Sequence, residues 1–312
     1  MSDSDLLLVF DCNNVVIRAH AGMMKSGLSS SKGVPTGGIF GAIRTFNTYI
    51  QKLKPTHVLC FWDYGRSTFR TALRSDYKGD RPKPAYLEPG ELQLTFQLFE
   101  EYLYLSGVSS FKEQGIEADD LIAGCVFSLR DQTPISIITA DHDLRQLVRQ
   151  PDPYPVTVVK PSMSGTKPNE QTYTYQSVID EYKLPPHRLA ELWAIEGDQS
   201  DNLTGLKGYG PAKSRKLLEE FGTLDNVIAN SPAMQGFERH IHENYRMIKL
   251  PGEATPERSY QLEDHEFQYN PVNVQLLIDF FEEYELNSFK KQLEEGTLFT
   301  PRADFRQGLH NL

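Results

Sequence analysis

Acidic residues gather in five short stretches that lie far apart along the chain. Two of these stretches, Asp141 with Asp143 and Asp198 with Asp201, hold aspartates only two or three positions apart. Packed carboxylates repel one another, so some must take up protons unless cations balance their charge. All-oxygen ligands favour hard ions such as Mg²⁺ and Mn²⁺. We therefore predict a metal site formed by Asp11, Asp63, Glu117, Asp119, Asp120, Asp141, Asp143, Asp198 and Asp201.

Divalent ions held in this way fit one kind of chemistry, the hydrolysis of phosphodiesters. Two ions about 4 Å apart can activate water and stabilise charge on the scissile phosphate and on the leaving oxygen. The 8 histidines are scattered, and no Cys or His spacing indicates zinc. His142 lies between two of the aspartates, where we expect it to face solvent or to assist in a minor way rather than to bind metal.

Three of the acidic stretches follow apolar runs that we predict to be buried strands. The carboxyl ends of parallel strands meet at one edge of an open sheet, and ligands bind in the crevice there. Any one of these aspartates could instead be a turn residue or a helix cap. That every one of these strands should be followed by an aspartate for that reason alone is much less probable. The runs and their acids are 6–10 with Asp11, 58–62 with Asp63, and 135–139 with Asp141 and Asp143.

Strands alternate with amphipathic helices in the first half of the chain, which predicts an α/β fold with a mostly parallel, doubly wound sheet. Glu117 and Asp120 then share a face at the start of a helix. We expect a core at 1–180, an almost wholly helical region at 181–297 and a tail at 298–312, packed as one unit. The other predicted elements are helices at 37–53, 91–106, 118–129 and 144–148, a strand at 108–111, and a hairpin of 156–160 with 171–175.

A glycine-rich segment follows Asp201 and ends in lysines, with the sequence GLKGYGPAK. Glycine allows positive φ and close backbone approach, and Pro211 suits the first turn of a helix whose free N–H groups bind phosphate. The pattern is typical of a helix–hairpin–helix that grips the DNA backbone and whose turn carbonyls can hold K⁺. An ordinary glycine-linked helix pair is the alternative. The predicted DNA contacts are Gly205, Lys207, Gly208, Gly210, Lys213 and Lys216.

A basic segment with aromatic residues begins at residue 68, close behind Asp63. A run of Lys and Arg is usually a solvated face, but beside a metal site it could clamp a phosphate. Arg70 would be one of the cations, and Tyr77 could stack on a base. We expect residues 64–90 to form a partly helical, mobile surface segment.

The composition is that of a globular protein with an acidic balance. The 312 residues carry a formal charge of −10, which argues against a non-specific nucleic-acid coat but not against an enzyme whose acids surround metal. No apolar run could span a bilayer, and residues 1–20 lack a signal pattern, so we expect an intracellular protein without a membrane partner. Cys12, Cys60 and Cys125 are expected to be free, buried thiols.

Taken in order, these motifs resemble the metal-dependent 5′-nucleases, a family that includes flap endonucleases, phage 5′–3′ exonucleases and the 5′-nuclease domain of bacterial DNA polymerase I. Cys12 and His142 depart from the commoner residues at their positions, but neither removes a carboxylate. The motifs are VFDCNNVVIR, GVPTGGIFGA, FWDYGRSTFR, SDYKGDRP, GIEADDLIA, TADHDLRQLV and EGDQSDNLTGLKGYGPAK.

The resemblance implies a PIN-like fold with a helical arch at about 64–90, although the proline-rich part of that segment is unlike its counterparts. It implies two or more bound Mg²⁺ ions, with Mn²⁺ able to substitute, and products with a 5′-phosphate and a 3′-hydroxyl. Arg18 would contact a phosphate, and Lys78 and Arg81 would act at the scissile phosphate. We expect a stand-alone monomer that cuts DNA at 5′ ends, flaps or nicks in replication or repair, with RNA–DNA hybrids as further candidates.

Two other functions stay open from the residues alone. A non-catalytic DNA-junction binder could keep the hairpin, although it would be expected to have lost some of the acids. A ribonuclease of the PIN type, or one like RNase H, would share the acidic sheet but would lack the helix–hairpin–helix.

Overall fold

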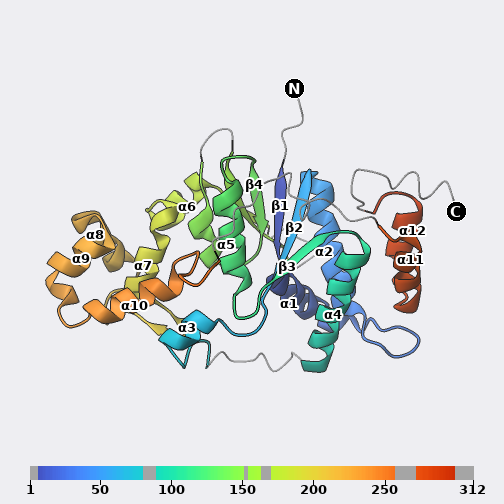
Figure 1. Cartoon of the computed structure of the whole chain (residues 1–312), viewed down its shortest axis with the longest axis horizontal. Helices are drawn as coiled ribbons and strands as arrows, with labels where there is room; N and C mark the ends of the chain where they lie inside the picture. Colours follow the sequence, from blue (N-terminus) through green and yellow to red (C-terminus); the bar gives the residue numbers. More distant parts are fainter. Residues whose placement is uncertain (1–5, 80–88, 151–153, 163–169, 257–271, 299–312) are drawn as a thin grey trace.

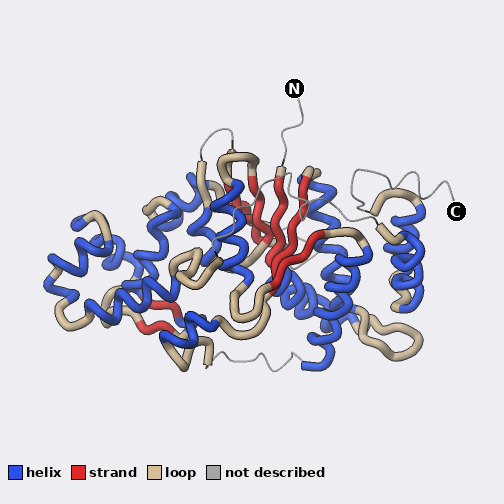
Figure 2. The backbone as a smooth tube through the Cα atoms, viewed as in Figure 1, coloured by secondary structure: helices blue, strands red, loops and turns tan. Residues whose placement is uncertain are grey.

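The computed structural model describes residues 6–79, 89–150, 154–162, 170–256 and 272–298, and a six-stranded sheet lies at its centre (Figure 1, Figure 2). The strands follow the spatial order β3-β2-β1-β4-β5-β6. All neighbours pair in parallel except the last two, which form the antiparallel hairpin that the sequence predicts. The strands are β1 (Leu7–Asp11), β2 (His57–Trp62), β3 (Ser109–Lys112), β4 (Ile135–Ile138), β5 (Val156–Lys160) and β6 (Gln171–Tyr173).

The strand order reverses between β1 and β4, which makes this position the topological switch point of the sheet. A crevice opens outside the carboxyl ends of the two strands on either side of such a point. In the register of the sheet, Asp11 of β1 lies beside Phe61 of β2, and Phe10 lies beside Ile138 of β4. The residues that follow β1, β2 and β4 therefore meet at the same edge.

The sheet separates two apolar cores, because successive side chains of a strand point to opposite faces. Leu8 and Phe10 of β1 belong to one core, whereas Leu7 and Val9 belong to the other. Both faces of the sheet are covered, which explains why its inner strands are continuously apolar rather than alternating.

Helices cover each face and extend the molecule at both ends (Figure 1). The core around Leu8 is shared with α1 (Cys12–Met23), α2 (Gly37–Leu53), α4 (Pro89–Leu105), α11 (Val274–Glu283) and α12 (Asn287–Glu294). The core around Leu7 is shared with α5 (Ala118–Leu129), α6 (Tyr175–Tyr182), α7 (Leu189–Glu196), α8 (Pro211–Phe221), α9 (Leu224–Asn230) and α10 (Glu238–Ile248). The short helix α3 (Thr68–Leu73) lies against α10.

The α/β class with its mostly parallel, doubly wound sheet is confirmed, and the helices at 37–53 and 118–129 lie where the sequence predicts them. The region at 181–297, which the sequence predicts to be almost wholly helical, also contains β7 (Gly197–Asp198) and β8 (Leu203–Thr204), which form a small antiparallel sheet around a 3₁₀ turn. The helix α1 was not predicted. Asn and Val are weak helix formers, and here the burial of Val15 and Val16 overrides their propensity.

The division of the chain into a core and a helical region stays a prediction. Residues 299–312 of the predicted tail lie outside the described residues, as do residues 80–88 of the predicted arch. Among the residues that the structure describes, no helix is both long and apolar enough to cross a membrane.

Candidate metal centre

Asp11 and Asp63 lie at the switch point, and backbone or hydroxyl donors hold both carboxylates in place. Asp11 is the N-cap of α1: its Oδ1 accepts a hydrogen bond from the amide of Asn14 at 3.1 Å, and its Oδ2 accepts one from the hydroxyl of Thr139 at 2.8 Å. Asp63 follows β2 and accepts a hydrogen bond from the amide of Ala118, at the start of α5, at 2.8 Å. The ends of three different elements thus fix these two acids.

Glu117, Asp119 and Asp120 form a second group, whose carboxylate oxygens lie within 4.8 Å of one another. The buried guanidinium of Arg70 lies against this group. Its Nη1 is 2.7 Å from Glu117 Oε2 and 2.5 Å from Asp120 Oδ2, and its Nη2 is 3.1 Å from Asp120 Oδ1. Its Nε donates to the carbonyl of Met247 at 2.8 Å. Arg70 therefore links the acids of α5 to the end of α10.

Two further side chains of the basic segment reach the same glutamate. The hydroxyl of Tyr77 lies 3.1 Å from Glu117 Oε2 and 3.0 Å from Asp201 Oδ2, and so bridges two acidic groups. Lys78 donates from Nζ to Glu117 Oε1 at 2.6 Å. Lys78 thus already lies at the acidic cluster, on the edge where the sequence predicts the scissile phosphate.

Asp143, Asp198 and Asp201 form a third group, with ligand oxygens within 4.8 Å of one another. Asp143 also belongs to a fourth group, with Asp141 and His142, that satisfies the same limit. Asp143 Oδ1 is buried and accepts no hydrogen bond from any of the described residues. A buried carboxylate oxygen without a donor is costly unless a cation or a proton occupies its lone pairs.

The groups are close enough for the charge on one to act on the next. Burial raises the pKa of Asp11 to about 7, and the charges of Asp63 and Asp141 contribute to that rise. Burial also raises the pKa of Asp63, and Glu117 adds to it. The acids that lie far apart in the sequence therefore form one electrostatic site.

The pKa values of Asp143 and Glu117 are shifted in opposite directions. Burial raises the pKa of Asp143 well above its ordinary value, and the neighbouring aspartates, led by Asp141, raise it further. Burial acts in the same direction on Glu117, but Lys78 and Arg70 outweigh it and hold the pKa of that carboxyl below its ordinary value. Among the described residues, no Lys or Arg forms an ion pair with Asp143, so a divalent ion would relieve repulsion on this side of the site.

The donor set fits hard divalent cations. The protein offers carboxylate oxygens from several elements, and such ligands suit Mg²⁺ and Mn²⁺. One of these oxygens, Asp143 Oδ1, has no hydrogen-bond partner among the described residues. All nine acids singled out in the sequence lie in this region, and their individual roles as metal ligands stay a prediction. The oxygens of Asp120, like those of Asp11 and Glu117, already accept hydrogen bonds, in this case from Arg70 and from the amide of Gly252.

The prediction that residues 64–90 lie at the surface is wrong for Arg70 and Tyr77, and their roles as DNA contacts stay predictions. Arg70 is 2 % exposed and Tyr77 is 6 % exposed, and both are engaged by the acidic groups. A basic run next to packed carboxylates folds onto them rather than into solvent, because the buried acids need counter-charges. Arg81 lies outside the described residues.

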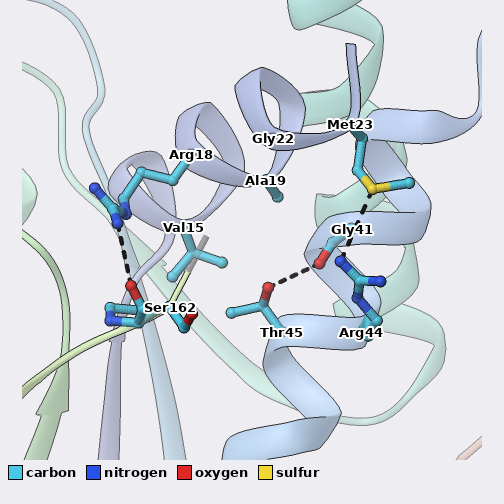
Figure 3. Close-up of a pocket in the computed structure, with 10 residues that line it drawn as sticks. Val15, Arg18, Ala19, Gly22, Met23, Gly41, Arg44, Thr45 and Ser162 are labelled. Atoms are coloured by element: carbon cyan, nitrogen blue, oxygen red, sulfur yellow. Dashed lines mark hydrogen bonds between the residues drawn. The ribbon is translucent and has the colours of Figure 1, made fainter. Parts of the chain in front are cut away.

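Arg18 lies on α1 and its guanidinium reaches the end of β5, where Nη2 donates to the carbonyl of Pro161 at 3.1 Å. Figure 3 shows this side chain at the rim of a small pocket between α1 and α2, with Thr45 and Arg44 on the other side. Its Nε is buried and has no hydrogen-bond partner among the described residues. The role of Arg18 as a phosphate contact stays a prediction.

The glycine-rich segment forms a tight turn between β8 and α8. Gly208 has a φ of 85°, in the left-handed region that glycine tolerates best. A Cβ at Gly205 would lie 1.9 Å from the carbonyl oxygen of Glu196, so that only glycine fits there. Pro211 opens α8, and Gly210 is its N-cap without a side-chain hydrogen bond. The lysines of this segment, Lys207, Lys213 and Lys216, are all exposed.

Sequence reasoning missed two side chains that help to build the site. Thr139 orients Asp11, and the signal was weak because a threonine at the end of a strand is common. His142 was expected to face solvent or to assist in a minor way, and its Nε2 lies 3.4 Å from Asp143 Oδ1 and 3.6 Å from Asp198 Oδ2. Its position between two aspartates was the available signal.

Comparison with known proteins agrees with this geometry. Residues 6–183 match the family model of the 5′-3′ exonuclease N-terminal resolvase-like domain, and residues 184–255 match that of the 5′-3′ exonuclease C-terminal SAM fold. The chain is 32% identical over 232 residues to the 5′-3′ exonuclease of Bacillus subtilis, covering 74% of this chain and 75% of that one. It is 27% identical over 295 residues to the 5′-3′ exonuclease of Aquifex aeolicus, covering 93% and 95%.

The chain also resembles part of a longer protein and the whole of a solved structure. The DNA polymerase I of Bacillus caldotenax is 28% identical over 92% of this chain, which spans only 32% of that protein. The flap endonuclease of bacteriophage T5, solved with DNA and metal ions, superposes with a TM-score of 0.64 at 18% identity, over 92% of this chain and 97% of that one. At 18% identity, this superposition shows that the two proteins share a fold and no more.

A parallel sheet with a carboxylate-lined switch point, joined to a glycine turn with exposed lysines, defines the class of metal-dependent nucleases. Within that class, the chain belongs to the 5′-3′ exonuclease family. Its function is accordingly that of a structure-selective 5′ nuclease, which is a hydrolase.

Proposed function

We propose that this protein hydrolyses DNA phosphodiesters at 5′ ends, flaps and nicks with two or more Mg²⁺ ions, for which Mn²⁺ can substitute. The observation that carries the proposal is the meeting of acids from five stretches of the chain at one edge of the sheet. When bound there, the ions would supply an activated water and would stabilise charge on the phosphate and on the leaving oxygen. The products would carry a 5′-phosphate and a 3′-hydroxyl.

The protein's own residues hold the reacting groups in this proposal. Asp11, fixed by Asn14 and Thr139, and the donor-free oxygen of Asp143 would hold ions on the two sides of the switch point. Lys78 would contact the scissile phosphate, with Glu117 holding its ammonium in place. Burial lowers the pKa of Lys78, but the charges of Asp201 and Glu117 outweigh burial and raise it, so that the side chain stays cationic at neutral pH.

The glycine turn and α8 would bind the duplex away from the site of cutting. Free N–H groups at the start of α8 and the exposed Lys207 and Lys213 suit a phosphate backbone, which carries no sequence information. A K⁺ ion at the turn is part of the proposal, as are Lys216 and Arg18 as further phosphate contacts. The proposal also includes RNA–DNA hybrids as substrates, a monomeric state, an intracellular location and a role in replication or repair.

The test is a product analysis on 5′-labelled flap, nicked, gapped and RNA–DNA hybrid substrates, with Mg²⁺ and with a chelator. We expect Mg²⁺-dependent cutting near the 5′ end that leaves ligatable 5′-phosphates. The Asp201→Asn variant should bind the flap as well as the wild type but should not cut it, which would also exclude a non-catalytic junction binder. Cutting that persists in the chelator, or in Asp201→Asn at the wild-type rate, would overturn the proposal.

A further inference from the structure

His142 lies between two predicted metal ligands and has no role in the proposed function. It lies between Asp141 and Asp143, and its side chain is only 36 % exposed. Its surroundings decide whether it is a bystander or a part of the centre.

The ring nitrogens of His142 face three carboxylates at distances that are too long for good hydrogen bonds. Nε2 lies 3.4 Å from Asp143 Oδ1 and 3.6 Å from Asp198 Oδ2, and Nδ1 lies 3.8 Å from Asp141 Oδ1. Asp143 Oδ1 accepts no hydrogen bond from any described residue, although Nε2 is its neighbour. Nε2 and Asp143 Oδ1 are not hydrogen-bonded to each other, and their separation of 3.4 Å is one that two ligands of the same ion can have. The imidazole also belongs to the group with Asp141 and Asp143 whose ligand atoms lie within 4.8 Å of one another.

The orientation of the ring is set by aromatic packing. His142 meets Trp193 of α7 edge to face, with ring centroids 4.9 Å apart and planes at 78°. Trp193 in turn packs edge to face against Tyr182, at 5.8 Å and 83°. Trp193 is itself buried, so the imidazole packs against a fixed support. A histidine that only faced solvent would not need one.

We propose that His142 is a metal ligand, binding through Nε2 an ion that Asp143 and Asp198 share. This inference rests on the proposed function, because it requires the metal centre to exist. Nδ1 would then carry the proton and point toward Asp141, and a carboxylate beside the second ring nitrogen is the usual support of a ligating histidine. The site becomes one of mixed nitrogen and oxygen ligands.

A mixed site has a consequence for the choice of ion. Imidazole suits borderline ions such as Co²⁺ and Ni²⁺ better than it suits Mg²⁺. The wild type should therefore bind Co²⁺ more tightly, relative to Mg²⁺, than a variant that has oxygen ligands alone. Substitution His142→Gln should weaken Co²⁺ binding about tenfold or more and Mg²⁺ binding much less.

A cationic histidine that merely offsets the charge of the acids is the competing explanation, and a lysine separates the two. The Lys ammonium has three donors and no acceptor, so His142→Lys keeps a positive charge but cannot bind a metal. If His142 acts only through charge, the lysine variant should bind ions as the wild type does.

The deciding experiment is electron spin echo spectroscopy of bound Mn²⁺ on tag-free wild type, His142→Gln, His142→Lys and, as a matched control, His242→Gln. His242 is on α10, with a half-exposed side chain whose recorded ion-pair partner is Asp225. We expect nitrogen-14 modulation from a coordinated imidazole in the wild type and in His242→Gln, and its loss in both His142 variants. Calorimetric titration with Co²⁺ and Mg²⁺ gives the affinities of the same four proteins.

The possible failures are distinct. Bound Mn²⁺ without nitrogen modulation in the wild type, or modulation that survives in His142→Gln, would overturn the assignment of His142 and leave the carboxylate centre intact. A wild type that binds no Mn²⁺ at all would overturn the proposed function together with this inference.

Discussion

Asp11 gives the sharpest prediction about the cost of assembling so many carboxylates. It is 7 % exposed, and burial together with the charges of Asp63 and Asp141 raises its pKa to about 7. In the unfolded chain an aspartate titrates near 3.9. The stability that this group contributes is therefore greatest below about pH 4 and is lost as the pH rises toward 7, because the unfolded chain ionises first.

The substitution Asp11→Asn removes the charge and keeps the shape. A shift of about 3 pKa units corresponds to about 4 kcal/mol of unfolding free energy above pH 7, at ~1.4 kcal/mol per unit. Asparagine caps a helix as well as aspartate does, so α1 should keep its N-cap. Weakening the bond with the Thr139 hydroxyl costs about 1 kcal/mol. Without metal at pH 8, the variant should be more stable than the wild type by ~2–3 kcal/mol.

Urea unfolding in a chelator at pH 4.5 and pH 8 measures this difference. The gain at pH 8 should disappear at pH 4.5, where the carboxyl of Asp11 is protonated in the folded protein. Saturating Mg²⁺ should reverse the order at pH 8, because ion binding stabilises the wild type more. Asp225→Asn, whose side chain is 84 % exposed, is the control and should show no such dependence. A gain for Asp11→Asn that is the same at both pH values would refute the electrostatic reasoning.

Other substitutions test the rest of the arrangement. Arg70→Met leaves buried acids without their cation and should lower the unfolding free energy by ~3–5 kcal/mol in urea titrations, and a loss below ~1 kcal/mol would speak against the buried pair. Lys78→Ala should reduce the single-turnover rate of flap cutting by roughly 10²-fold with little change in binding, and an unchanged rate would exclude it from the phosphate. Lys213→Ala should weaken duplex binding and lower the slope of log affinity against log salt by about one phosphate contact, whereas an unaltered slope would count against the glycine turn as a grip. Gly205→Ala should cost ~3 kcal/mol and Gly208→Ala only ~1 kcal/mol in thermal or urea unfolding, because the first meets a carbonyl and the second only a positive φ; equal losses would contradict this placement.

The sheet and the collection of acids could be predicted because they depend on local patterns. Short apolar runs that end in aspartate specify both a buried strand and the edge at which its acid lies. The helices at α2 and α5 follow from apolar spacing that the tertiary structure keeps. For the same reason, Asp11, Asp63 and Asp141 could be assigned to one edge of the sheet without coordinates.

Features that depend on partners distant in the sequence could not be predicted. The burial of Arg70 needs Asp120 and Met247, which lie 50 and 177 positions away. The helix α1 forms against its propensity because its valines are buried against other elements. The orientation of His142 is set by Trp193, on a helix that no local pattern connects to the acids. In each case the local sequence is compatible with more than one conformation or environment, and tertiary packing selects one of them.

Anomalous diffraction from crystals soaked in Mn²⁺ tests most directly whether the carboxylates at the edge of the sheet bind divalent metal. We expect at least one strong peak at Asp143 and Asp198 and a second near Asp11, with carboxylate oxygens as ligands. Crystals that bind Mn²⁺ elsewhere and show these carboxylates without an ion would contradict this expectation.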